Sequence, residues 1–77
     1  MSAAAAVGGQ SRSISLALDL LGVLSSAEAV AEKLMDAAYE EAEPGLVYAA
    51  RGVREKLREG RGLLEAVLRA RLGAPEA

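Results

Sequence analysis

The stretch Glu40-Glu41-Ala42-Glu43-Pro44-Gly45-Leu46 decides the fold of this 77-residue chain. Pro44 cannot continue a helix, and it disfavours helical geometry at Glu43, while Gly45 permits a turn. Apolar residues recur at helical spacing on both sides of this break, so each side is expected to form a helix. The sequence therefore predicts an antiparallel helical hairpin that folds back about Pro44-Gly45.

The charges on the two sides of the break are opposite in sign. Residues 13–43 carry seven acidic residues and one lysine, a net charge of −6, whereas residues 46–72 carry seven basic and three acidic residues, a net charge of +4. Exposed pairs of opposite charge contribute roughly 0–1 kcal/mol each, so we expect them to set orientation and register more than stability. The expected pairs are Glu40 with Arg51, Asp36 with Arg54, Glu32 with Arg58, and Glu28 with Arg61.

A stripe of apolar and small residues follows each expected helix at alternating spacings of three and four. This spacing places the members of a stripe on one helix face. Folding back about Pro44-Gly45 brings Leu34 opposite Leu57 and Ala31 opposite Gly60, and the latter small-residue contact would let the helix axes approach closely. The stripes are Ala17, Leu20, Leu24, Ala27, Ala31, Leu34 and Ala38, and then Leu46, Ala50, Val53, Leu57, Gly60, Leu64 and Val67.

Two glycines leave the continuity of the helices open. Gly22 is followed by Ser25 and Glu28, which match a capping box, so the first helix can end at Gly22 and a new one begin at Ser25. Alternatively a single helix covers residues 13–43, because an internal glycine costs only about 1 kcal/mol. The second helix can stop near Glu59, with a third helix beginning near Gly62, or it can continue through Gly60, and the unbroken register favours continuity. The fold class is all-α, with two long helices that either pass through these glycines or break there.

The two ends of the chain are expected to be tails. Residues 1–12 show no periodic apolar pattern and include Gly8-Gly9, which indicates a disordered N-terminal arm. Residues 13–72 make up the helical hairpin domain, and residues 73–77, with the stop signal Gly73-Ala74-Pro75, make up a C-terminal tail.

The small size of the hairpin predicts that it needs a partner. A single core of this size seldom supplies more than about 3–5 kcal/mol, and the absence of Cys and His removes disulfides and the usual zinc sites. A two-helix hairpin also has no third layer to cover apolar residues outside its stripes, and such surface marks an interface. The expected interface residues are Leu18, Leu21, Val30, Met35, Tyr39, Val47, Leu63, Leu68 and Leu72.

The partner is expected to be a protein. The simplest one is a second copy, so that a homodimer completes a four-helix bundle, and the next is a set of helices in a larger complex. We therefore expect a non-enzymatic adaptor or structural subunit with no catalytic residue, metal or cofactor, because roughly 60 helical residues leave little room for a polar pocket. Residues 14–24, the best apolar stretch, contain Asp19 and are too short to span a membrane, and no secretory signal is evident. A cytoplasmic location is compatible with the absence of Cys.

The alternative function is a helical nucleic-acid-binding module. Four arginines along the second helix could each contact a phosphate, which would make binding sensitive to salt. Acidic residues interrupt this face, and aromatic residues that could stack on bases are few, so this alternative is the less favoured one. The arginines concerned are Arg51, Arg54, Arg58 and Arg61.

Overall fold

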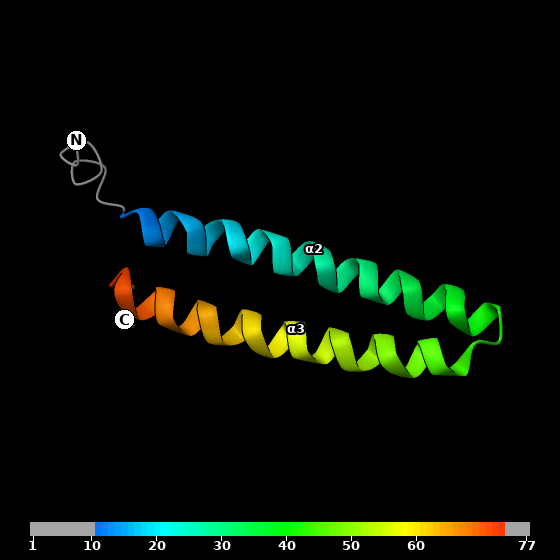
Figure 1. Ribbon diagram of the computed structural model, residues 1–77. Coiled ribbons are helices and arrows are strands. Elements are labelled where there is room, and N and C mark those ends of the chain that lie inside the picture. The colour runs from blue at the N-terminus through cyan, green and yellow to red at the C-terminus, as the bar shows by residue number, and fades with distance from the viewer. Residues whose placement is uncertain (1–10, 74–77) are drawn as a thin grey trace.

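The computed structural model describes residues 11–73, which form two antiparallel helices joined by a short turn (Figure 1). Helix α2 covers Arg12–Glu40 and helix α3 covers Pro44–Arg71. Within residues 11–73 there is no strand. The predicted all-helical hairpin is therefore confirmed.

Helix α2 begins at the edge of the predicted N-terminal arm. The Ser11 side-chain oxygen accepts a hydrogen bond from the backbone N–H of Ile14 at 3.2 Å, which satisfies one of the free amide donors of the first helical turn. Ser11 and Arg12 thus belong to the start of the hairpin. Residues 1–10 of the predicted arm and residues 74–77 of the predicted tail lie outside the described residues.

The turn lies earlier in the chain than predicted. The backbone N–H of Glu43 donates to the carbonyl of Ala38 at 2.8 Å and that of Ala42 donates to Tyr39 at 3.2 Å, the two bonds of a Schellman motif. Ala42 takes the left-handed conformation, with φ of 58°, that glycine usually supplies in this motif. Pro44 is in the first turn of α3, where its missing N–H costs nothing. The chain therefore reverses at residues 41–43 and not at Pro44-Gly45.

Both helices pass through their internal glycines without a break. Helix α2 continues across Gly22 and α3 continues across Gly60, so the capping-box alternative at Ser25 is wrong and the prediction of continuity is confirmed. A Cβ added at Gly60 would have no atom within 4 Å outside its own helix surroundings. Gly60 is therefore not a point where the two backbones approach closely, and the predicted contact with Ala31 is wrong.

On each helix, the residues that are covered by the other helix recur at alternating spacings of three and four residues. We call these residues the seam. Among residues 11–73, only Ala31, Ala38, Ala50 and Leu68 are more than nine-tenths buried. The hairpin thus has a narrow core made mainly of alanine. The buried and half-buried seam residues are Ile14, Ala17, Leu21, Leu24, Glu28, Ala31, Met35 and Ala38 on α2, and Val47, Ala50, Arg54, Leu57, Arg61, Leu64 and Leu68 on α3.

The seam is rotated relative to the predicted stripes. Leu20 and Leu34, expected in the stripe of α2, are 46% and 42% exposed, while Leu21 and Met35, expected outside it, are half-buried. Helix α2 has apolar residues at about four of every seven positions, which form a stripe wider than one neighbouring helix can cover. Spacing alone therefore did not determine which two of these positions face the other helix.

Replacing the most buried alanine tests how closely the helices pack. Ala38 is 1% exposed, so Ala38→Leu should force the helices apart and lower the free energy of unfolding by about 1–3 kcal/mol. Ala29→Leu, at an exposed position of the same helix, should leave stability nearly unchanged. Urea unfolding at one protein concentration measures both variants, and equal midpoints would show that Ala38 is not confined by α3.

Candidate functional site

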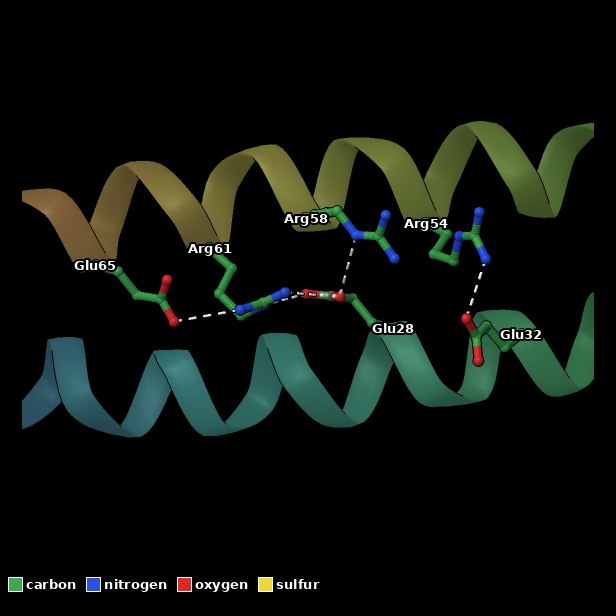
Figure 2. Close-up of polar contacts among 6 residues, drawn as sticks. All are labelled: Glu28, Glu32, Arg54, Arg58, Arg61 and Glu65. Carbon is green, nitrogen blue, oxygen red and sulfur yellow. Dashed lines mark hydrogen bonds and ion pairs between the residues drawn. The ribbon is translucent and has the colours of Figure 1, made fainter.

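One long side of the hairpin carries ion pairs that join the helices, and Glu28 is at their centre (Figure 2). Arg61 donates from Nε and Nη2 to the two carboxylate oxygens of Glu28, and from Nη1 to Glu65 at 3.2 Å. The Glu28 side chain is only 13% exposed, and the Arg58 Nε lies 3.9 Å from one of its oxygens. This bidentate salt bridge between an arginine and a carboxylate requires one relative orientation of the two side chains.

The surroundings of Glu28 favour its charged form. The hydrogen bonds from Arg61 lower the pKa of the Glu28 carboxyl, helped by the positive charges of Arg61, Arg58 and Arg54, although partial desolvation opposes them. The same bonds raise the pKa of Arg61. Both groups therefore keep their charges across the physiological pH range.

Two of the three ion pairs that join the helices within residues 11–73 differ from the predicted set by about one helical turn. The pair of Glu28 with Arg61 is confirmed. Arg54 contacts Glu32 at 3.0 Å and not Asp36, and Arg58 lies near Glu28 and not Glu32. Because the chain reverses before Pro44, each residue of α3 lies level with an earlier residue of α2 than predicted.

The fourth predicted pair does not form, since no ion pair joins Glu40 to Arg51 within residues 11–73. Three of the four arginines proposed as nucleic-acid contacts, Arg54, Arg58 and Arg61, have a glutamate carboxylate within 4.0 Å. Their charges are already matched within the hairpin. Contact with phosphates would have to compete with these pairs, and nucleic-acid binding stays a prediction.

The opposite long side of the hairpin is apolar, and we call it the apolar face. Two grooves follow it between the helices, of about 530 Å³ and about 450 Å³, and almost all of their lining is carbon. Nine large hydrophobic side chains, each 42–70% exposed, lie along this side at spacings of three, four, seven and ten residues. They are Leu16, Leu20, Val23, Val30, Leu34, Leu46, Val53, Leu63 and Val67.

The two grooves differ in the size of the side chains that line them. The groove nearer the turn is lined by four alanines and four larger residues: Ala27, Ala31, Ala49 and Ala50, and Val30, Leu34, Val53 and Leu57. The groove nearer the chain ends is lined by Leu20, Leu24, Gly60, Leu63, Leu64 and Val67. The apolar face therefore has a half with small residues near the turn and a half with bulky residues near the ends.

The predicted interface residues fall into three groups. Val30 and Leu63 lie on the apolar face. Leu18, Tyr39 and Leu72 are exposed, but their seven-residue spacing from Glu32 and Glu65 places them on the charged side. The expectation that the remaining four lie outside the seam is wrong, because they are buried or half-buried within it: Leu21, Met35, Val47 and Leu68.

Sequence reasoning missed seven members of the apolar face. Five of them had been assigned to the stripes between the helices, namely Leu20, Leu34, Leu46, Val53 and Val67. The other two, Leu16 and Val23, precede Val30 in a strict seven-residue repeat. That repeat is the signal that could have identified a second apolar line on α2.

The described residues contain no cluster of three or more residues that could hold a metal ion. Helix α2 is long and apolar enough to cross a membrane by length and composition, with a mean hydropathy of 1.6 over 18 residues. A helix that is covered by other helices in a soluble protein passes the same test, as does a signal sequence. The expected lack of a membrane span thus stays a prediction.

No protein-family model, curated protein or solved structure matches this chain.

The lowered pKa of Glu28 predicts a loss of stability in acid. A carboxyl whose folded-state pKa is below the usual 4.5 stabilises the fold above that pH, and this contribution disappears as the pH falls through the lowered pKa. Glu28→Gln should be less stable than the natural chain at neutral pH and should lose less stability on acidification.

Urea midpoints at about pH 7 and about pH 3 measure this difference. Glu55→Gln, an exposed carboxylate of α3 outside the seam, is the matched control and should follow the natural chain. An equal acid-induced loss in Glu28→Gln and the natural chain would show that the pair with Arg61 does not stabilise the fold.

Proposed function

We propose that this chain is a small, non-enzymatic protein-interaction module, an adaptor or structural subunit, whose apolar face is covered by helices of another polypeptide. The observation that supports the proposal is the gathering of nine large hydrophobic side chains on one side of the hairpin. Contiguous apolar surface of this kind on a small protein marks an interaction site.

The charged side of the hairpin explains why the partner is expected on one side only. Glu28, Glu32, Arg54 and Arg58 lie together there, with both signs of charge interspersed and paired (Figure 2). Such a surface is well solvated. A flat pair of helices with one solvated side and one apolar side has the form of half of a four-helix bundle.

The size of the seam also favours a partner. Four residues, three of them alanines, make up the well-buried core, so the hairpin gains little from its own packing. Covering nine half-exposed Leu and Val side chains would contribute about 1 kcal/mol each, on the order of 10 kcal/mol before the entropic cost of association. Association can therefore supply stabilisation that the isolated hairpin lacks.

A polar substitution on the apolar face should weaken association. Val30 and Leu63 are 61% and 70% exposed, so Val30→Glu and Leu63→Glu disturb the seam little but place a charge where a partner would bury it. We expect the natural chain to sediment at micromolar concentration with a mass above its 7.9 kDa, and both variants to shift toward 7.9 kDa.

The control is Tyr48→Glu, a residue that is 77% exposed and lies outside the apolar face. It should assemble as the natural chain does. Circular dichroism alongside sedimentation reports whether a variant that dissociates also loses helix. A natural chain that is a cooperatively folded monomer at micromolar concentration and binds no other polypeptide through this face would contradict the proposed function.

A further inference from the structure

Helix α2 carries a row of residues along the outer edge of the apolar face that the hairpin itself does not use. The row recurs every seventh residue, three positions after each member of the line that contains Leu16, Val23 and Val30. All of its members are exposed, and none takes part in an ion pair within residues 11–73. We call it the outer charge row: Arg12, Asp19, Ser26, Lys33 and Glu40.

The signs of the outer charge row invert about its centre. Read from Arg12 to Glu40, they are positive, negative, neutral, positive and negative, so the row is complementary to its own reverse about Ser26. If a second α2 lies antiparallel on the first with the two Ser26 side by side, Asp19 of each copy faces Lys33 of the other. Arg12 likewise faces Glu40. Residues that flank an apolar seam in this way set orientation and partner choice.

The charges along helix α3 are also complementary to their own reverse, about the midpoint of that helix. Along the part of α3 that borders the apolar face, the charged residues are Lys56 and Glu59, and glycine or alanine occupies most of the remaining edge. These two side chains are 83% and 72% exposed and only 4.0 Å apart at their charged ends, which is a weak contact within one helix. An antiparallel second α3 centred between residues 57 and 58 would place Lys56 of each copy beside Glu59 of the other.

The midpoint of the outer charge row on α2 and the midpoint of α3 lie at the same level of the hairpin. Ala27 lines a groove together with Leu57, and Leu24 lines the other groove together with Gly60. Ser26 is therefore level with the segment between residues 57 and 60, which contains the midpoint of α3. One two-fold axis can satisfy both sets of charges.

We infer that the polypeptide covering the apolar face is a second copy of this chain, with its turn at the opposite end and the two-fold axis passing near Ser26. This inference rests on the proposed function and names its partner. The two copies form a four-helix bundle in which α2 packs on α2 and α3 packs on α3, each pair antiparallel.

The shape of the apolar face agrees with this arrangement. A two-fold axis near Ser26 places the half near the turn, which is lined by Ala27, Ala31, Ala49 and Ala50, against the half near the ends of the other copy. The bulky residues Leu20, Leu63 and Val67 of that half then enter a groove of about 530 Å³. Large residues opposite small ones is the pattern that fills a core.

The arrangement with both turns at the same end fits less well. It would pack α2 of one copy on α3 of the other, and each half of the apolar face would meet its own equivalent, so that the alanine-lined half near the turn would meet the same half of the other copy. At the levels seen in the hairpin, Asp19 and Glu40 would then face Ala66 and Gly45, and Lys33 would lie about one helical turn from Lys56. This arrangement leaves Asp19 and Glu40 without basic partners and places the two lysines near each other.

Charge reversal tests the inference through the dimer dissociation constant of the full chain, measured by sedimentation over a concentration series. Residue 19 of each copy faces residue 33 of the other, so Asp19→Lys or Lys33→Asp alone creates two contacts between like charges in the dimer. Each single variant should therefore raise the dimer dissociation constant about tenfold. The double variant Asp19→Lys with Lys33→Asp should return to the natural value. Residues 19 and 33 are about 21 Å apart along one helix, so only a contact between copies can produce this rescue.

Asp36→Lys is the matched control, because Asp36 is an exposed acid of α2 outside the outer charge row. It should leave the dissociation constant unchanged. High salt should reduce the effects of the single variants, because exposed charges are screened.

Spin labels measure the arrangement directly. The chain has no cysteine, so Ser26→Cys and Ser15→Cys, both at exposed positions of α2, each provide one labelling site. With turns at opposite ends, the distance between the two labels at residue 26 is short, and that at residue 15 includes an additional axial separation of about 33 Å. With turns at the same end, the two distances are equal.

The outcomes separate this inference from the proposed function. A dimer without charge rescue, or with equal label distances, would overturn the inference and leave the proposed function standing. A natural chain that stays monomeric but binds a different polypeptide through Val30 and Leu63 would do the same. A folded monomer that binds nothing, or a monomer that sediments with phospholipid vesicles through this face, would overturn both.

Discussion

The bidentate salt bridge between Glu28 and Arg61 is the constraint on which the rest of the hairpin depends. It lies in the middle of both helices, and Glu28 is the least exposed charged side chain among the ion pairs. A carboxylate that is partly withdrawn from water needs its partner, so the rotation of α2 about its axis is fixed by the need to keep Glu28 toward α3. The positions that remain for apolar packing follow from that rotation.

Placing Glu28 in the seam divides the apolar residues of each helix into two groups. One group, which includes Leu24 and Leu57, packs between the helices, and the other, which includes Leu34 and Val53, lies on the apolar face. Polar and charged residues in the seam also select one register, because a shift would leave them unpaired. The hairpin thus gains specificity from Glu28 and Arg61 and leaves much of its apolar surface for another chain.

The proposed dimer explains why the predicted apolar stripes do not coincide with the seam of a single hairpin. The apolar stripes identified by spacing, with Leu20, Ala27 and Leu34 on α2, point between the neighbouring helix and the apolar face. In a four-helix bundle this is the direction of the bundle axis, since each helix there has two neighbours. The stripe in the sequence then corresponds to the core of the assembly, and the seam of a single hairpin is one of its edges.

The sequence by itself determined that the chain is helical on both sides of Pro44, that the two sides are antiparallel and that opposite charges join them, because helical periodicity, Pro44 and the charge difference are local or summed properties of the chain. It also indicated the pair of Glu28 and Arg61. The tertiary structure alone decided the register and rotation. The chain reverses at Ala42, a residue with no intrinsic preference for the left-handed conformation it adopts, and this moves every residue of α3 level with an earlier residue of α2. Four apolar positions in every seven fit several rotations equally well, so only the packing and pairing of side chains chose Leu21 and Met35 for the seam and left Leu20 and Leu34 exposed.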